Sequence, residues 1–283
     1  MFNVEMELRK LFVSLFIIIS ITGTIYAQKT FSQTEEQIIS KTVAMRFSTR
    51  MCSTADEAIR KIDAFNKEIK ASAEWNSLGE QAKLTFDNMI VQEKYSYIYE
   101  KNAKDAQLKD LILAQYNKII AWNEAHPSAV KNKWYILSSG DVINSSMQYL
   151  SQSLAIKYGL QEKEDYDALI NEYPDFSFAL INSALWYYYA PAIGGGSTKK
   201  AADYFKKAFT KASSDYEKYY SSIYYSQICF ENKDNANAAF YLKEAEKLSG
   251  QDRYINFIRK LNSNNFSLFY YINNREKVEK KLQ

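Results

Sequence analysis

The stretch 186–208 reads WYYYAPAIGGGSTKKAADYFKKA, and the fold depends on how it is interpreted. Three glycines, a Ser-Thr pair and two lysines at the start of a helix could form a phosphate-binding loop, or the joint between two helices. A Walker-type loop needs a buried strand before it and the order Gly-Lys-Ser/Thr within it. Here the order is GGGSTKK, and the residues before Pro191 have helical spacing. We therefore predict a helix-to-helix turn over residues 190–196, with Ser197 or Thr198 capping the next helix.

The composition favours long helices with short connections. The chain has 283 residues, of which 47% are hydrophobic and 24% charged, so it can bury a substantial core. It contains only 8 glycines and 3 prolines, well below their usual combined share of roughly 12%. A β-sandwich or a doubly wound fold needs more turn residues than that. No strand pattern with a period of two persists, so we predict an all-α fold of roughly ten to twelve helices.

Capping and stop signals place the boundaries of these helices. A hydroxyl residue followed three places later by an acid forms a capping box at a helix start. Proline and glycine are typical just beyond a helix end. The predicted starts are Ser32 with Glu35, Ser53 with Asp56 and Ser77 with Glu80, and the predicted stops are His126, Gly159, Tyr173, Ala190 and Gly250.

The N-terminal residues have the pattern of a secretory leader. Arg9 and Lys10 precede the apolar run 11–21, which is too short to span a bilayer. We expect cleavage after Ala27 and a periplasmic or secreted product, with no membrane span after cleavage. The predicted organisation is a signal peptide over 1–27, an N-terminal helical region over 28–139 and a helical repeat region over 140–283, the last two being separate or continuous as one domain.

Cysteine and histidine are too scarce for the common metal and nucleophile sites. The single histidine, His126, precedes a proline at a predicted helix end. Neither a zinc site of histidines and cysteines nor a histidine-based triad can be assembled. Cys52 and Cys229 do not make a disulfide framework. One bridge stays open, although a buried small apolar role for Cys229 and an incidental one for Cys52 are favoured. We expect no metal, no cofactor and no catalytic residue.

The charged residues suggest solvated helix faces. The formal net charge is only +3, and lysines alternate with acids without forming a basic stripe, so we expect no nucleic-acid partner. One acidic cluster is denser than the rest, and we interpret it as the first turns of a helix, where acids favour the positive end of the helix dipole. Its members are Glu162, Glu164, Asp165 and Asp167.

A repeated helix face marks the C-terminal half. Two alanines and one large apolar residue leave small notches that a neighbouring helix can approach closely. The first set is Ala201, Phe205 and Ala208, and the second, 37 residues later, is Ala238, Leu242 and Ala245. The helices before them carry related positions: Leu180, Ser183, Ala184 and Tyr187 in one, and Ser222, Tyr225, Ser226 and Cys229 in the other.

These paired positions resemble the tetratricopeptide repeat family, in which a large-small-aromatic helix precedes an Ala-Phe-Ala helix. The resemblance is good over residues 175–250 and faint over 141–174, where Pro174 matches the closing proline of the family. The spacing of 37 residues departs from the family period, which is about 34. The resemblance implies antiparallel helix pairs stacked as a right-handed superhelix, and a protein or peptide partner.

The same resemblance implies that the first helix of each pair lines a concave binding side. The chain is rich in tyrosine, with 23 residues, and tyrosine suits both binding surfaces and packing edges. The alternative is that the helices after Arg253 fold back and cover these faces. The partner-binding residues expected are Phe178, Ile181, Asn182, Leu185 and Tyr188 on the first stripe, and Tyr220, Ile223, Gln227 and Phe230 on the second.

We predict an exported, bacterial, non-catalytic binding or assembly module for a protein or peptide of the cell envelope. Two alternatives stay open. The chain is also similar to helical periplasmic subunits that assist certain tripartite solute transporters, which carry a similar glycine turn; these are typically anchored through a cysteine, and none lies near the expected cleavage site. The less favoured alternative is a hydrolase or lyase on an α/α scaffold. A pocket with two acids and a strongly shifted pKa favours the enzyme, a dry tunnel the solute carrier, and an open groove the peptide binder.

Overall fold

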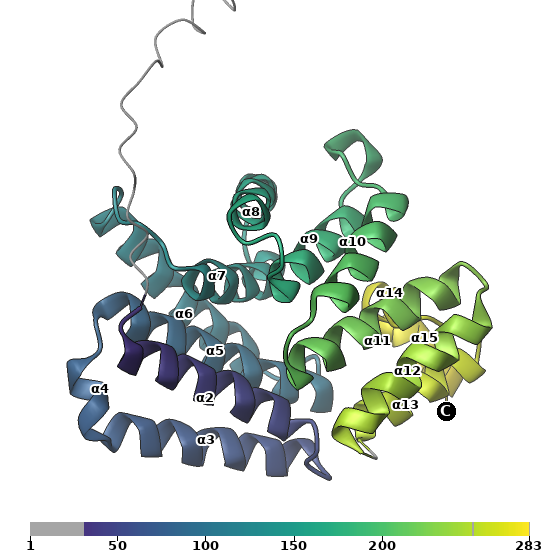
Figure 1. Cartoon of the computed structure of the whole chain (residues 1–283), viewed down its shortest axis with the longest axis horizontal. Coiled ribbons are helices and arrows are strands. Elements are labelled where there is room, and N and C mark those ends of the chain that lie inside the picture. Colours follow the sequence, from purple (N-terminus) through teal and green to yellow (C-terminus); the bar gives the residue numbers. More distant parts are fainter. Residues whose placement is uncertain (1–30, 251, 283) are drawn as a thin grey trace, which may run out of the picture.

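Fourteen α-helices and no strand make up the residues that the computed structural model describes, 31–250 and 252–282 (Figure 1). The predicted all-α fold is confirmed, and the expected leader over 1–27 lies outside the described residues. The helices are α2 (Gln33–Thr49), α3 (Ala55–Ala71), α4 (Ala73–Ser77), α5 (Glu80–Lys101), α6 (Gln107–Ala125), α7 (Lys133–Ser146), α8 (Gln152–Glu172), α9 (Ser177–Tyr189), α10 (Thr198–Lys211), α11 (Asp215–Glu231), α12 (Asn235–Ser249), α13 (Arg253–Ser263), α14 (Leu268–Asn273) and α15 (Arg275–Leu282), with two 3₁₀ turns, η1 (Met147–Tyr149) and η2 (Ala192–Gly194).

The predicted helix starts are correct in part. Ser32 forms the expected capping box with Glu35, because its hydroxyl accepts a hydrogen bond from the Glu35 amide and the carboxylate accepts one from the Ser32 amide. The second start is one residue later than the predicted Ser53, since Thr54 caps α3. The third is wrong: Ser77 ends the short helix α4 instead of starting α5.

Four of the five predicted stops are confirmed and one is wrong. The stop predicted at Gly159 does not occur, because this residue lies inside α8, where the indole nitrogen of Trp186 donates to its carbonyl oxygen at 2.7 Å. An isolated glycine costs a helix only about 1 kcal/mol relative to alanine, so tertiary contacts can override it. The confirmed helix ends have His126, Tyr173, Ala190 and Gly250 as their C-cap residues.

The glycine-rich stretch is a helix-to-helix turn, as predicted, and α9 precedes it where a phosphate loop needs a strand. Gly195 has a positive φ of 97°, a conformation that other residues rarely adopt. A Cβ at Gly196 would lie 1.8 Å from the carbonyl oxygen of Ala190, so only glycine fits there. Ser197 caps α10 by accepting a hydrogen bond from the Lys200 amide.

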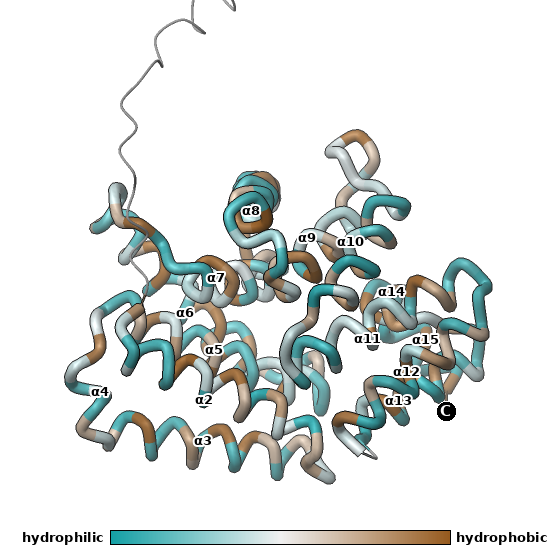
Figure 2. The backbone as a smooth tube through the Cα atoms, in the orientation of Figure 1, coloured by the Kyte–Doolittle hydropathy of each residue, from teal (hydrophilic) through white to brown (hydrophobic). Residues whose placement is uncertain are grey.

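Helix pairs build the core, and their faces alternate between hydrophobic and hydrophilic, as Figure 2 shows clearly along α3. Helix α9 packs against α10, and α11 packs against α12. The predicted repeat faces are confirmed as buried, and so is Cys229; Cys52 is buried as well, and both cysteines are free thiols. The buried repeat residues are Ala201, Phe205 and Ala208 on α10 and Ala238, Leu242 and Ala245 on α12.

The notches on these faces give a first testable prediction. Each alanine of the two sets is buried against a neighbouring helix, so a leucine there has no space to occupy. We expect Ala201→Leu, Ala208→Leu, Ala238→Leu and Ala245→Leu each to destabilise the protein by about 1–3 kcal/mol. Urea denaturation of the four variants measures this loss. Four unchanged midpoints would show that the assigned repeat register is wrong.

The N-terminal and C-terminal helices meet and close an arc. Figure 1 shows α2 to α6 on one side, α11 to α13 on the other, and α7 to α10 between them. Arg275 donates to the carbonyl oxygens of Tyr99 at 2.7 Å and Glu100 at 2.9 Å, and Arg253 forms an ion pair with Glu100. These contacts join the two predicted regions directly, and the boundary predicted between residues 139 and 140 lies within α7. Among the described helices, none is both long and apolar enough to cross a membrane.

Candidate functional site

Two adjoining cavities hollow the inner side of the arc. One, of about 240 Å³, lies among α2, α5, α7, α9 and α11, and we name it the arginine pocket after Arg46 and Arg50 in its wall. The other, of about 830 Å³, reaches α8 and α14, and we name it the acid pocket after Asp141 and Glu162. The two adjoin, because their walls share Gln92, Asp141, Asn182, Leu185 and Tyr224, and we refer to them together as the cleft.

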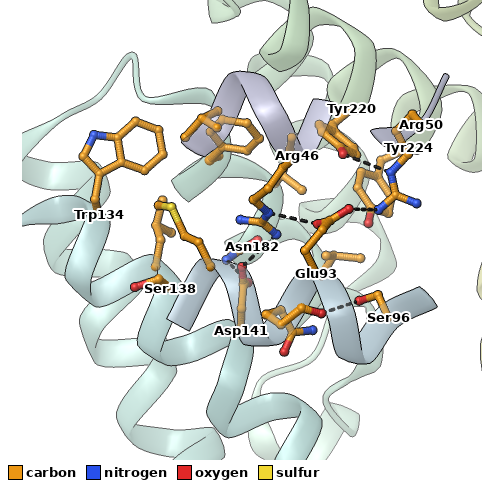
Figure 3. Close-up of a pocket in the computed structure, with 17 residues that line it drawn as sticks. Arg46, Arg50, Glu93, Ser96, Trp134, Ser138, Asp141, Asn182, Tyr220 and Tyr224 are labelled. Carbon is orange, nitrogen blue, oxygen red and sulfur yellow. Dashed lines mark hydrogen bonds and ion pairs between the residues drawn. The ribbon is translucent and has the colours of Figure 1, made fainter. Parts of the chain in front are cut away.

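A buried ion-pair cluster forms one wall of the arginine pocket (Figure 3). The carboxylate of Glu93 accepts hydrogen bonds from Arg46 Nε at 2.9 Å, Arg50 Nη2 at 3.1 Å and Thr49 Oγ1 at 3.2 Å. Its side chain is only 2% exposed. Burial alone would raise the pKa of Glu93, but Arg50 and Arg46 outweigh it and lower that pKa below its ordinary value. Glu93 is therefore an anion that holds both guanidinium groups in place.

Aromatic rings fix the second of these cations. The guanidinium of Arg50 lies 5.1 Å from the ring centroid of Tyr97, 5.9 Å from that of Tyr220 and 5.4 Å from that of Tyr254. It also donates to the Tyr220 hydroxyl at 3.2 Å. Cation–π contacts are attractive at such separations, so Arg50 links α2 to the C-terminal helices.

Asp141 lies where the two cavities meet. Its Oδ2 atom is 3.8 Å from Arg46 Nη2, and its Oδ1 atom accepts a long hydrogen bond of 3.4 Å from Asn182 Nδ2. The side chain is 31% exposed. Burial raises the pKa of Asp141, and Arg46 and Asn182 offset only part of that increase. Figure 3 shows Asp141, Asn182 and the Arg46 guanidinium lying close to one another.

Glu162 is the second carboxyl of the acid pocket, and its position corrects the sequence interpretation. The acidic cluster was expected in the first turns of a helix, but α8 starts at Gln152, so Glu162 lies at the middle of it. Glu162 is 5% exposed, and its Oε1 atom has no hydrogen-bond partner among the described residues. Burial raises the pKa of Glu162 well above its ordinary value, and Asp141 adds to the increase.

A second orphaned polar group lies one turn further along α8. The hydroxyl of Tyr166 also lacks a hydrogen-bond partner within the described part of the chain, although the residue is almost fully buried. It lies against α7, since a Cβ at Gly140 would be 2.5 Å from this hydroxyl. Both Glu162 and Tyr166 line the acid pocket. The Oε1 atom of Gln92, in the same wall, also lacks a partner in the described part of the chain. Buried polar groups are normally satisfied, so three orphans in one wall call for an explanation.

Exposed hydrophobic side chains gather around the acid pocket. Eight large hydrophobic residues are exposed in the described part of the chain, and four of them line this one cavity. Scattered exposed hydrophobics need no explanation, whereas a contiguous group marks a site of interaction. The four are Ile156 and Leu160 on α8, Tyr189 at the end of α9 and Ile272 on α14.

Four of the five residues of the first predicted stripe line the cleft. Phe178, Ile181, Asn182 and Leu185 all contribute to the wall of the arginine pocket, and Tyr220 from the second stripe joins them. They come from α9 and α11, the first helices of the two predicted pairs. These five residues are therefore brought together around one cavity.

The other predicted residues line neither pocket, and α14 covers two of them, Tyr188 and Gln227. The ring of Tyr188 packs 4.4 Å from that of Phe269, and its hydroxyl donates to Glu231. Ile223 and Gln227 are fully buried, and the Gln227 Oε1 atom accepts a hydrogen bond of 2.8 Å from the Leu268 amide. Phe230 lines a separate hollow beside α12 and α13. The covering helices that the sequence left as an alternative thus bury two of the four residues of the second stripe, Ile223 and Gln227.

The sequence did not single out Arg46, Arg50, Glu93 or Asp141. A signal for Glu93 was present, since it follows Ile90 by three residues and so falls on the buried face of α5. No group of three or more His, Cys, Asp or Glu side chains suited to a metal ion lies together in residues 31–250 and 252–282. A comparison with protein-family models, with curated proteins and with solved structures finds no match to this chain.

Proposed function

We propose that this protein is a non-catalytic binding module whose cleft receives a segment of a protein or peptide partner in the cell envelope. In this proposal the helix pairs form a right-handed superhelix of the tetratricopeptide type, and the leader pattern of residues 1–27 directs a bacterial protein to the periplasm or the medium. The observation that carries the proposal is the gathering of four exposed hydrophobic side chains around one cavity of about 830 Å³.

The walls of the cleft suit a peptide. Phe178 and Leu185 offer apolar surface, while the amide of Asn182 can pair with a backbone group of an extended or helical segment. The cavities lie between packed helices, so the surface is preformed and little entropy is lost in ordering it. Tyr224, which lines both pockets, adds a rigid aromatic surface with a polar tip.

Leu185 provides the test, because it lies in the shared wall of both pockets. Peptides are first selected from a random library on the immobilised protein, and the best is then titrated by calorimetry. We expect Leu185→Asp to raise the Kd at least about tenfold, since it places a charge against the apolar part of the ligand. The control is Phe240→Asp, at a side chain that is 53% exposed on α12 and outside the cleft. Equal losses in both variants, or no selected peptide, would contradict the proposal.

A hydrolase or lyase is the second candidate, because Asp141 and Glu162 line one cavity and the pKa of Glu162 is raised well above its ordinary value. Mass spectrometry of the selected peptide after incubation separates the two functions. Recovery of the intact peptide supports the binding module. Cleavage of the peptide by the wild-type protein, and no cleavage by Asp141→Asn, would support the enzyme.

A further inference from the structure

All the charged side chains in the wall of the acid pocket are acidic. Asp141 and Glu162 are the only charged side chains in its wall, and no lysine, arginine or histidine lines it. Asp141 lies 3.8 Å from Arg46, on the arginine-pocket side, where the Nε atom of Arg46 is already bonded to Glu93 at 2.9 Å. Opposite Glu162, helix α9 contributes no charged residue at all. The cavity therefore presents carboxylates to whatever enters it.

The charged side chains that line the cleft leave one negative charge without a matching cation when all are ionised. Arg46 and Arg50 carry two positive charges, whereas Glu93, Asp141 and Glu162 carry three negative charges when all are ionised. Burial of an unpaired carboxylate is costly, and it raises the pKa of Glu162 well above its ordinary value. A cation bound beside Glu162 would satisfy the same charge directly.

The orphaned groups show where such a cation would be held. Glu162 Oε1 and the Tyr166 hydroxyl are both acceptors without partners, and both residues line the pocket with Asp141. An ammonium group has three N–H donors and no acceptor, which matches a set of oxygen acceptors. Tyr189 and Tyr224 lie in the same wall, and aromatic rings attract cations and pack against the apolar body that carries them. The ring of Trp186, also in this wall, already has the Lys163 ammonium group 5.6 Å from its centroid.

We propose that the acid pocket binds a primary ammonium group on an apolar or aromatic body, held by Asp141 and Glu162. The group is either a lysine side chain of the peptide partner or a free amine. This inference rests on the proposed function of the cleft and adds the chemistry that its ligand must carry.

Two probes distinguish the sources by titration calorimetry. Phenethylamine represents the free amine, with 2-phenylethanol as its uncharged counterpart. A blocked peptide with one lysine represents the partner, with norleucine in place of lysine as its control. We expect the amine or the lysine peptide to bind at least about tenfold more tightly than its uncharged counterpart. Equal binding of the charged and uncharged members of both pairs, or displacement of both probes by calcium, would overturn the proposal.

Glu162→Gln removes the charge without changing the shape of the side chain. We expect it to weaken binding of the charged probes by about ten- to a hundredfold. Its melting temperature should stay the same or increase, because Glu162 is a buried carboxyl with an orphaned oxygen in the empty protein. Glu164→Gln, an exposed position on the same helix, is the matched control and should bind normally. Unchanged binding by Glu162→Gln would overturn the proposal, and so would a loss of binding that only follows a large drop in melting temperature.

Proton release gives a second readout. Burial, Asp141 on α7 and Asp165 on α8 raise the pKa of Glu162, and Asn144 offsets only part of that increase. An ammonium group favours the carboxylate, so binding at neutral pH should release a proton and tighten as the pH rises toward the pKa of the amine. Titrations in buffers of different ionisation enthalpy measure this release. If a selected peptide without lysine binds the cleft and neither amine probe does, the proposed function stands and this inference fails.

Discussion

Glu93→Gln should destabilise the protein by about 3–5 kcal/mol. The substitution leaves Arg46 and Arg50 buried without their shared anion, and an amide supplies only one acceptor oxygen for the three hydrogen bonds that Glu93 now accepts. Urea denaturation at neutral pH measures the loss. Glu68→Gln, at an exposed position on α3, is the control and should change little. A loss below about 1 kcal/mol, the range of surface ion pairs, would show that the cluster is hydrated.

The same carboxylate gives a pH dependence of known sign. In the folded protein the pKa of Glu93 is lowered, so its ionised form stabilises the fold fully above the pKa of the unfolded chain, about 4.3. This stabilisation is lost as the pH falls through the lower, folded pKa. The wild-type midpoint in urea should therefore fall steeply below about pH 4, and the midpoint of Glu93→Gln should fall less.

Phe205→Ala should destabilise the protein by about 3–5 kcal/mol. Phe205 is fully buried on α10, and its ring stacks at 5.6 Å on both Tyr224 and Phe269. Removing the ring leaves a cavity between the repeat face and α14, and the chain around it can relax only in part. The control Phe240→Ala removes a ring that is 53% exposed, and should change stability by less than about 1 kcal/mol.

The Phe205 ring also supports the cleft, because Tyr224 lines both pockets. We expect Phe205→Leu, which retains most of the buried volume, to recover much of the stability and the peptide binding that Phe205→Ala loses. Calorimetric unfolding and peptide titration of the two variants measure this recovery. Equal stability of Phe205→Ala and wild type would place α10 outside the core.

The fold was predictable from the sequence where a helix boundary or a helix face depends only on residues close together in the chain. The notch alanines, Pro191 and the cap at Ser197 were placed correctly because helical periodicity and capping depend on neighbouring residues. The stop predicted at Gly159 failed because a distant residue, Trp186, hydrogen-bonds inside α8. Because of that error we expected a helix to start after Gly159, and we therefore interpreted Glu162 as a residue of its first turns.

The candidate site was predictable only on one side. Phe178, Ile181 and Leu185 follow from the spacing on α9, so the sequence placed them on one face. The opposite wall comes from α2 and α5, where Arg46 and Glu93 lie 47 residues apart and meet only in the folded chain. The cover over Gln227 comes from α14, a helix too short to give a periodic signal.

The most direct test of the cleft as the binding site is photo-crosslinking with the selected peptide. Benzoylphenylalanine is introduced at Leu185, in the wall shared by both pockets, and in a second protein at Phe240, on the outside of α12. Each protein is irradiated with the peptide, and the adducts are mapped by mass spectrometry. The proposed function predicts adducts from position 185 that excess unlabelled peptide suppresses, and none from position 240. Adducts from position 240 alone, or equal adducts from both positions, would contradict it.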